Sequence, residues 1–144
     1  MAVPEKLAQI VTLFATAPQN VKLQALLDYS RRLPELPDGM AESGRFERVE
    51  ECQSPLFLRA DIGEDQVVKL WFDAPAEAPT TRGFAGILAE GLEGATVDEI
   101  LELPEDFYVD LGLDDVVSSL RTRGMGAIVF RMKRQLRKQK PTAS

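Results

Sequence analysis

Residues 56–73 of the chain read LFLRADIGEDQVVKLWFD. Apolar side chains recur at every second position through 56–60 and again through 68–72, which is the period of a half-buried strand. The residues between the two runs, 62–66, are typical of a turn. The stretch therefore predicts an antiparallel β-hairpin whose inward side chains are Leu56, Leu58, Ala60, Val68, Leu70 and Phe72.

The chain before the hairpin predicts two helices and a short strand. Apolar residues at helical spacing indicate a helix over 5–17, and Asn20 is expected to cap a second helix. That helix should stop before residues 33–37, LPELP, because each proline disfavours helical geometry in the residue before it. A polar loop over 38–45 then leads into a short extended segment at 46–50.

The chain after the hairpin predicts further helices. Thr96 and Glu99 have the spacing of a capping box, in which each side chain accepts a hydrogen bond from the backbone of the other residue. The expected segments are a helix that Thr80 or Thr81 caps and Gly94 ends, the short helix opened by Thr96, a turn over 104–109, and a final helix preceded by Ser118 or Ser119.

The order helix, helix, three strands, then helices describes an α+β fold, with a small antiparallel sheet covered by helices. We expect a single domain over residues 1–144, in which 136–144 form a frayed or disordered tail.

The composition narrows the protein class. Of the 144 residues, 44% are hydrophobic and 28% are charged, as is typical of a soluble globular domain. No apolar run approaches the roughly 20 residues that span a bilayer, and the N-terminus lacks a signal-peptide pattern. A single cysteine allows no internal disulfide, so the cytoplasm is the expected compartment. The net charge of −6 argues against a nucleic-acid partner, because binding phosphates needs a basic surface.

Missing residue types exclude several classes of site. The chain has no histidine, which excludes Ser-His-Asp and Cys-His catalytic pairs and histidine metal sites. One cysteine cannot build a four-cysteine zinc or iron–sulfur site. No phosphate-binding glycine loop and no dinucleotide fingerprint are present. We therefore expect no metal site.

Basic side chains crowd the C-terminal segment. Two explanations are open: a solvated last helical turn whose cations complement the helix dipole, or a site for an anionic protein partner or RNA. The residues concerned are Arg131, Lys133, Arg134, Arg137, Lys138 and Lys140.

Cys52 is the main candidate for chemistry. It follows a short strand and precedes Pro55, which places it in a connection, and connections run over surfaces. Free cysteines are nevertheless among the most buried residues, so a packing role is open as well. An ordinary thiol is only about 3% ionised at pH 7, and Glu50 and Glu51 should lower that fraction further. If Cys52 reacts, a cation elsewhere must stabilise its thiolate or a partner must supply the electrophile.

Two segments place arginine beside glycine near a helix start. In residues 118–126, SSLRTRGMG, Gly124 would let another part of the chain come close and Arg121 could stabilise a thiolate. The alternative is an irregular helix start with solvated arginines. In residues 80–86, TTRGFAG, Arg82 lies near a helix start, and the two glycines suggest a helix packed against the sheet.

Taken in order, these pieces resemble the SufE family of sulfur-acceptor proteins, which work with SufS-type cysteine desulfurases in iron–sulfur cluster assembly. The resemblance spans roughly residues 20–137. The matching motifs are Leu-Pro-x-Leu-Pro at 33–37, Val-x-x-Cys-Gln-Ser at 49–54, Arg-Gly at 82–83, Gly-x-Thr-x-x-Glu-Ile at 94–100, Leu-Gly-Leu at 111–113 and Ser-x-Arg-x-x-Gly-Met at 119–125.

The resemblance implies that Cys52 accepts persulfide sulfur from a desulfurase, raises its turnover and passes sulfur to an iron–sulfur scaffold. Pyridoxal phosphate belongs to the desulfurase, so no cofactor is expected on this chain, which would be a sulfur-transfer accessory protein rather than an independent enzyme. Arg121 is implied to stabilise the thiolate or persulfide, or to contact the desulfurase. The supporting residues that the match implies are Gln53, Ser54, Arg82 and Gly124, together with Glu51, which stands where the family usually has glycine.

Two alternatives of other classes are open. A non-catalytic desulfurase regulator or binding module would use the same surface with Cys52 inert, and the unusual Glu51 is the residue that favours it. A cysteine redox enzyme or peroxidase is disfavoured, because the chain has neither a resolving cysteine nor a histidine.

Overall fold

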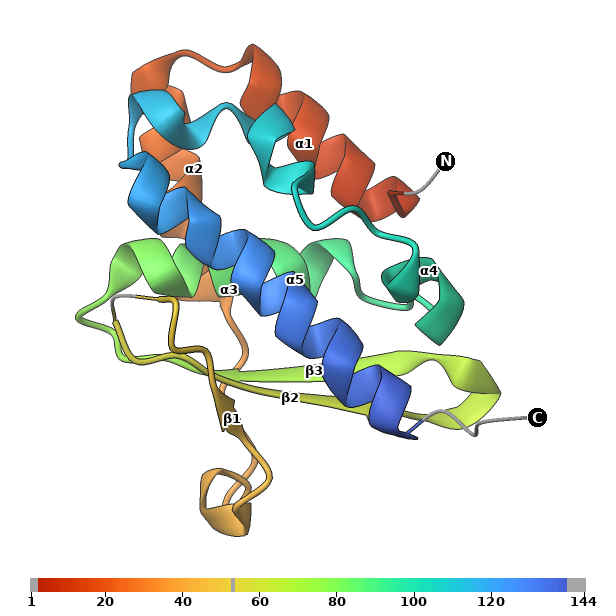
Figure 1. Cartoon of the computed structure of the whole chain (residues 1–144). Coiled ribbons are helices and arrows are strands. Elements are labelled where there is room, and N and C mark those ends of the chain that lie inside the picture. Colours follow the sequence, from red (N-terminus) through yellow and green to blue (C-terminus); the bar gives the residue numbers. More distant parts are fainter. Residues whose placement is uncertain (1–2, 53, 140–144) are drawn as a thin grey trace.

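The computed structural model describes residues 3–52 and 54–139. They form a three-stranded antiparallel sheet and a set of helices packed around a shared hydrophobic core (Figure 1). This is the α+β arrangement expected from the sequence. No helix in these two ranges is both long and apolar enough to cross a membrane.

The predicted hairpin is confirmed. β2 (Phe57–Ile62) pairs antiparallel with β3 (Val68–Asp73) along its whole length. A short strand, β1 (Glu47–Arg48), lies on the other side of β2, which gives the order β1-β2-β3. Leu70 is only partly buried. The inward side chains that are fully part of the core are Leu56, Leu58, Ala60, Val68 and Phe72.

Helices cover the sheet and each other. In the described ranges the α-helices are α1 (Glu5–Thr16), α2 (Gln19–Arg32), α3 (Pro79–Gly91), α4 (Val97–Leu101) and α5 (Ser119–Gln139). Short 3₁₀ turns are η1 (Ala41–Ser43), η2 (Glu64–Gln66), η3 (Phe107–Leu111) and η4 (Leu113–Asp115). The longest helix, α5, crosses the sheet against β2, while α3 contacts β3 as well as α1 and α2 (Figure 1).

Two helices begin earlier than the polar residues of the sequence suggested. The N-cap of α2 is Pro18, so Asn20 is not the cap. α3 begins at Pro79, so the predicted threonine cap is wrong, and it ends at Gly91 rather than at Gly94. Proline lacks an N–H that the first turn would leave unpaired anyway, and its fixed φ suits that position.

Two other helix starts are confirmed. The Thr96 hydroxyl accepts a hydrogen bond from the Glu99 N–H at 3.3 Å, and the Glu99 carboxylate accepts one from the Thr96 N–H at 2.9 Å. Ser118 precedes α5, and its hydroxyl oxygen accepts a hydrogen bond from the Arg121 N–H at 3.3 Å. Capping of this kind fixes where each helix begins.

α2 and α3 pack at very short range. A Cβ on Gly86 would lie 2.2 Å from the carbonyl oxygen of Tyr29, and one on Gly83 would lie 2.7 Å from that of Leu26. The expectation that these glycines pack against the sheet is therefore wrong. They set how closely α3 approaches α2, because only glycine leaves room for the facing backbone.

Two glutamine side chains of α5 form hydrogen bonds with the edge of β2 that a neighbouring strand would otherwise form. β1 is only two residues long and leaves much of one edge of β2 uncovered. Gln135 accepts a hydrogen bond from the Ala60 N–H (2.8 Å) and donates to the Leu58 carbonyl (3.0 Å). One helical turn later, Gln139 accepts from the Ile62 N–H (3.1 Å) and donates to the Ala60 carbonyl (2.6 Å). These bonds satisfy backbone groups that an open edge would expose.

The last helix extends into the segment expected to fray. Residues 136–139 continue α5, where Leu136 is fully buried and Gln139 bonds to β2. The remainder of the expected tail, 140–144, lies outside the described residues.

Candidate functional site

Cys52 lies in the loop that joins β1 to β2. The base of this loop is closed by a hydrogen bond of 2.8 Å from the Val49 N–H to the Leu56 carbonyl. Both of these side chains are completely buried, so the two ends of the loop are anchored in the core. A further bond of 3.1 Å, from the Cys52 N–H to the Val49 carbonyl, makes residues 49–52 a tight turn. The cysteine therefore sits on a short loop between two fixed points.

The sulfur of Cys52 is turned inward against α5. The residue is only 7% exposed, and its Sγ lies 4.0 Å from the carbonyl oxygen of Gly124. A Cβ on Gly124 would come within 3.1 Å of that sulfur. The absence of a side chain at Gly124 therefore leaves the space that the thiol occupies.

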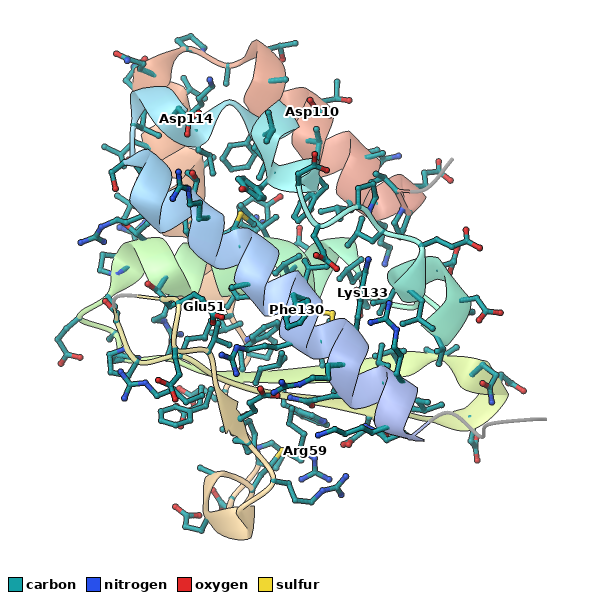
Figure 2. The ribbon with its side chains drawn as sticks, viewed as in Figure 1. Glu51, Arg59, Asp110, Asp114, Phe130 and Lys133 are labelled. Atoms are coloured by element: carbon teal, nitrogen blue, oxygen red, sulfur yellow. The ribbon has the colours of Figure 1, made fainter. Side chains whose placement is uncertain are left out.

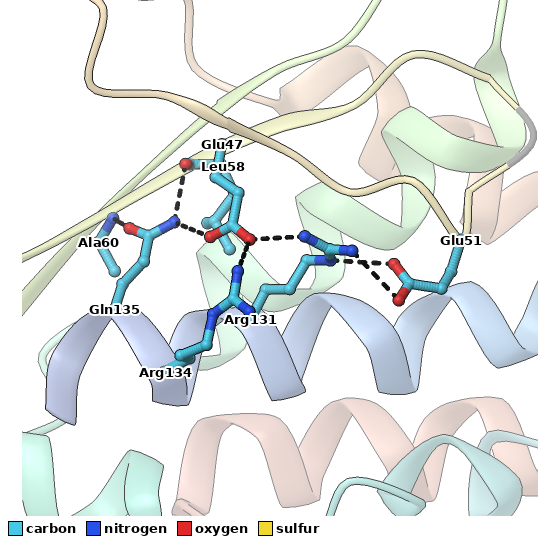
Figure 3. Close-up of polar contacts among 7 residues, drawn as sticks. All are labelled: Glu47, Glu51, Leu58, Ala60, Arg131, Arg134 and Gln135. Carbon is cyan, nitrogen blue, oxygen red and sulfur yellow. Dashed lines mark hydrogen bonds and ion pairs between the residues drawn. The ribbon is translucent and has the colours of Figure 1, made fainter. Parts of the chain in front are cut away.

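A charged network ties the same loop to α5 (Figure 3). Arg131 donates two hydrogen bonds to the carboxylate of Glu51, from Nε to Oε1 at 2.9 Å and from Nη2 to Oε2 at 3.2 Å. Its remaining nitrogen, Nη1, donates to Glu47 of β1 at 2.5 Å. Arg134 and Gln135 also donate to the Glu47 carboxylate. Arg131 therefore bridges β1 and the cysteine loop with one guanidinium group.

The carboxylates of this network are held ionised. Hydrogen bonds from Arg131 hold the pKa of Glu51 below its usual value. Burial alone would raise the pKa of Glu47, but hydrogen bonds from Gln135 and Arg131 outweigh it and lower the pKa overall. Both groups therefore remain charged at neutral pH.

The thiol of Cys52 is held in its protonated form. Burial raises its pKa to about 11, with a further increase from the Glu51 carboxylate and a partial offset from Arg131. At pH 7 such a thiol is ionised in only about one molecule in ten thousand. Since the thiolate is the nucleophile, the closed loop is an unreactive arrangement.

Arg131 is the residue beside the cysteine loop that the sequence analysis did not place there. Arg121, the expected partner of the thiolate, is exposed in the first turn of α5, and the arginine that acts on the pKa of Cys52 is Arg131. Of the supporting residues, Ser54 is half-buried and Gln53 lies outside the described residues. The structure thus brings together Glu51, Cys52 and Gly124 from the expected set.

Arg82 makes its contacts with other segments of the chain. Its Nη1 donates to the Ala74 carbonyl at 2.6 Å, and its Nε donates to the Ser30 carbonyl at 3.4 Å. The side chain joins the segment after β3 to the C-terminal turn of α2. These contacts give Arg82 a tethering role in the fold.

The basic C-terminal segment is only partly solvated. Arg131 and Arg134 pair with Glu47, and the nearly buried Lys133 lies 3.6 Å from Glu105. A solvated helix end is therefore the wrong description for Arg131 and Lys133, whereas Arg134 is paired with Glu47 but 47% exposed. The spacing of three residues puts Arg131 and Arg134 on one side of the helix, where they share Glu47 as a partner.

A shallow hollow adjoins the cysteine loop. It has a volume of about 320 Å³, and Phe130, nearly half exposed, projects from α5 beside it. Figure 2 shows Phe130 and Lys133 along α5 with Glu51 next to the helix. The other residues that line it are Glu105, Asp106, Tyr108, Gly126 and Ala127. In the described part of the chain, no three Cys, Asp or Glu side chains gather closely enough to hold a metal ion.

Comparison with known proteins gives a consistent family assignment. The family described as "SufE: Fe-S metabolism associated domain" matches residues 8–136. Two proteins of Mycobacterium tuberculosis, both named uncharacterized SufE-like proteins, are 52% identical over 136 residues, which cover 94% of this chain and 94% of each relative. A Plasmodium vivax protein named cysteine desulfuration protein SufE is 24% identical over 89% of this chain and 51% of its own length.

A solved structure shares the fold. The solution structure of a hypothetical protein from Thermus thermophilus superimposes with a TM-score of 0.83 at 43% sequence identity. The match covers 94% of this chain and 96% of that one.

Proposed function

The chain belongs to the SufE family, and from this membership we propose that it is a sulfur carrier that accepts persulfide sulfur on Cys52 and stimulates a cysteine desulfurase. The observation that carries the proposal is the setting of Cys52. The only cysteine of the chain lies in a loop anchored at both ends, with its sulfur in a space that Gly124 keeps free. A single thiol on one short loop suits transfer between proteins, once contact with a partner exposes it, better than chemistry in an enclosed pocket.

The transfer step is an exchange at sulfur. The Cys52 thiol loses its proton to water, and the thiolate attacks the outer sulfur of a persulfide held on a cysteine of the desulfurase. A new S–S bond forms at Cys52 while the S–S bond of the donor breaks, and the donor cysteine leaves as a thiolate. The persulfide only changes its carrier, so the step needs no outside oxidant or reductant.

The partners follow from the same proposal. A SufS-type desulfurase would hold the pyridoxal phosphate that abstracts sulfur from cysteine, and an iron–sulfur scaffold would receive the sulfur afterwards. We assign the exchange to the cytoplasm, where thiols stay reduced. Arg121 is exposed three residues before Gly124 on α5, a position from which it can contact the desulfurase.

The protonated thiol is compatible with a carrier. Buried and with a pKa of about 11, Cys52 is protected from oxidants and stray electrophiles in the free protein. Attack on a persulfide needs both thiolate and access. We therefore expect contact with the desulfurase to change the surroundings of Cys52 before sulfur moves.

The proposal can be tested with the purified protein, a SufS-type desulfurase and cysteine. Sulfide release and the intact mass of the chain are followed for the wild-type protein and for Cys52→Ser. We expect stimulation and an added mass of about 32 Da, one sulfur atom, only in the wild-type protein. Equal stimulation by Cys52→Ser, together with no added mass on Cys52 of the wild-type protein, would contradict the carrier function.

A second function is favoured by one specific observation. The inward, protonated sulfur of Cys52 is also what a non-catalytic regulator of the desulfurase would show. Such a regulator would bind the desulfurase and change its turnover, while Cys52 stayed free of sulfur. The experiment with Cys52→Ser separates the two functions.

A further inference from the structure

We propose that Arg131 is a positioning residue for the sulfur transfer: its ion pair with Glu51 holds the cysteine loop closed, and the pair must separate before Cys52 can react. The inference deepens the proposed function and rests on it, because it assigns a step that precedes the exchange at sulfur.

The contacts of the loop support this assignment. Between the buried anchors Val49 and Leu56, two polar side-chain contacts to α5 are present among the described residues. One is the weak 4.0 Å contact from the Cys52 sulfur to the Gly124 carbonyl. The other is the two-pronged pair of Glu51 and Arg131, the stronger of the two by type and geometry. The ion pair is therefore the main polar side-chain contact that ties the loop to α5 between its anchors.

Of the two partners in the ion pair, only Glu51 is free to move away. The Arg131 side chain is 17% exposed and is also held by Glu47, which belongs to the sheet. The Glu51 side chain is 48% exposed and forms no second ion pair among the described residues. A cationic group on the desulfurase can therefore compete for Glu51 while Arg131 stays in place. The loop would move, and α5 would not.

A purely electrostatic role for Glu51 and Arg131 predicts a different change in the reaction rate of Cys52. The charged groups that act on the Cys52 thiol are Glu51, which disfavours the thiolate, and Arg131, which favours it. If the two residues acted only through their charges, removing Glu51 would speed a reaction of the thiol and removing Arg131 would slow it. If they restrain the loop, removing either one should speed the reaction. The sign of the Arg131 effect separates the two mechanisms.

The experiment measures alkylation of Cys52 by iodoacetamide, a neutral reagent, followed by intact mass near neutral pH. The variants are Glu51→Gln, Arg131→Gln and the double substitution, each compared with the wild-type protein. We expect each single change to raise the rate by about fivefold, the upper range for a partly exposed pair. The double variant should be no faster than the faster single variant, because one restraint can be removed only once.

Matched controls identify the residue responsible. Glu50→Gln removes an exposed carboxylate next to Glu51 that makes no ion pair among the described residues, and it should leave the rate unchanged. Arg134→Gln removes the ion pair with Glu47 but leaves both hydrogen bonds between Arg131 and Glu51 in place, so it should change the rate less than Arg131→Gln. Arg131→Lys keeps the charge but loses the two-pronged geometry, so its rate should lie between those of the wild type and Arg131→Gln. Thermal unfolding of each variant confirms that the fold is retained.

Three results would overturn the inference: opposite signs for the two single variants, unchanged rates in both, or equal acceleration by Arg134→Gln and Arg131→Gln. If Arg131→Gln does not fold, Glu51→Gln tests the inference by itself, because this substitution changes an exposed side chain. An unchanged alkylation rate of Glu51→Gln would then overturn the inference. Alkylation needs no desulfurase, so this outcome is independent of the sulfur adduct that tests the proposed function.

Discussion

At the level of single residues, three features of the surroundings of Cys52 determine how readily its thiol ionises. Burial against α5 disfavours the charged thiolate of Cys52, Glu51 adds to this effect, and Arg131 partly offsets it. Glu51 and Arg131 also bind each other, so the two charges that act on the sulfur are parts of one ion pair. The reactivity of Cys52 therefore depends on where the loop lies as much as on the chemistry of the thiol.

The raised pKa predicts a loss of stability at alkaline pH. The Cys52 thiol has a pKa of about 11 in the folded protein against an ordinary value of 9.0, so between these pH values the unfolded chain binds fewer protons. The contribution of Cys52 to the free energy of unfolding is complete below the lower value. It is lost as pH rises towards the higher one, by at most about 1.4 kcal/mol per pH unit.

Urea unfolding of the wild-type protein and of Cys52→Ser over this pH range measures the effect. Serine does not titrate there, so subtracting the two stabilities removes the contributions of lysines and tyrosines. We expect the difference to shrink steadily with rising pH. A difference that stays constant across the range would show that the thiol is not buried in its neutral form.

At the scale of elements, the contact between α2 and α3 is the most sensitive to a small change. A methyl group at Gly86 would lie 2.2 Å from the Tyr29 carbonyl, which is backbone and cannot rotate away. We expect Gly86→Ala to lower the free energy of unfolding by about 3 kcal/mol, the top of the usual range for overpacked sites. Urea unfolding monitored by circular dichroism gives the value.

Gly124→Ala is the matched control for this substitution. It also adds a methyl group to a helical glycine, but the nearest atom is the Cys52 sulfur at 3.1 Å, on a loop that can shift. Alanine also favours the helix by about 1 kcal/mol, which offsets part of the strain. Gly86→Ala should therefore be clearly the more damaging change, and equal losses would mean that α2 can move away from α3.

The residues at which helices begin were harder to predict than the presence of the helices and strands themselves. Alternating apolar residues predicted the hairpin correctly, because each strand has one buried face, and the spacing of Thr96 and Glu99 predicted the start of α4. The starts of α2 and α3 were missed because proline, and not a polar cap, occupies the first positions. A proline can end one helix and begin the next, and local sequence does not separate these roles.

At the scale of the whole molecule, α5 joins the sheet to the site. Through Gln135 and Gln139 it completes the edge of β2, and through Arg131 it holds the cysteine loop. We expect Gln135→Leu to lower the free energy of unfolding by about 2 kcal/mol, because it leaves backbone groups of Ala60 and Leu58 unpaired. The uncovered edge should also promote self-association at high protein concentration.

The control is Gln9→Leu, which makes the same chemical change at an exposed position of α1. It should alter stability by less than about 0.5 kcal/mol. Urea unfolding and light scattering measure the two effects. Equal stability of the two variants would show that water replaces the glutamine at the strand edge.

The site was only partly visible in the sequence. Cys52, Glu51 and Gly124 belong to local motifs and were identified from them. Arg131 was grouped with the other basic residues of the C-terminal segment, because nothing local shows that this turn faces Glu51, 80 positions earlier. This contact depends on how α5 packs on β2. The periodicity of apolar residues predicts each element but does not show how two distant elements pack together.

The anchoring of the cysteine loop limits the distance over which sulfur can be delivered. Cys52 is three residues from Val49, whose side chain is completely buried. A fully extended chain of this length moves the cysteine no more than about 10 Å from its anchor. A loop of this length is too short to carry the sulfur between two separate binding sites on the protein. We therefore expect donor and acceptor to take turns at the same patch of surface, each excluding the other while it is bound.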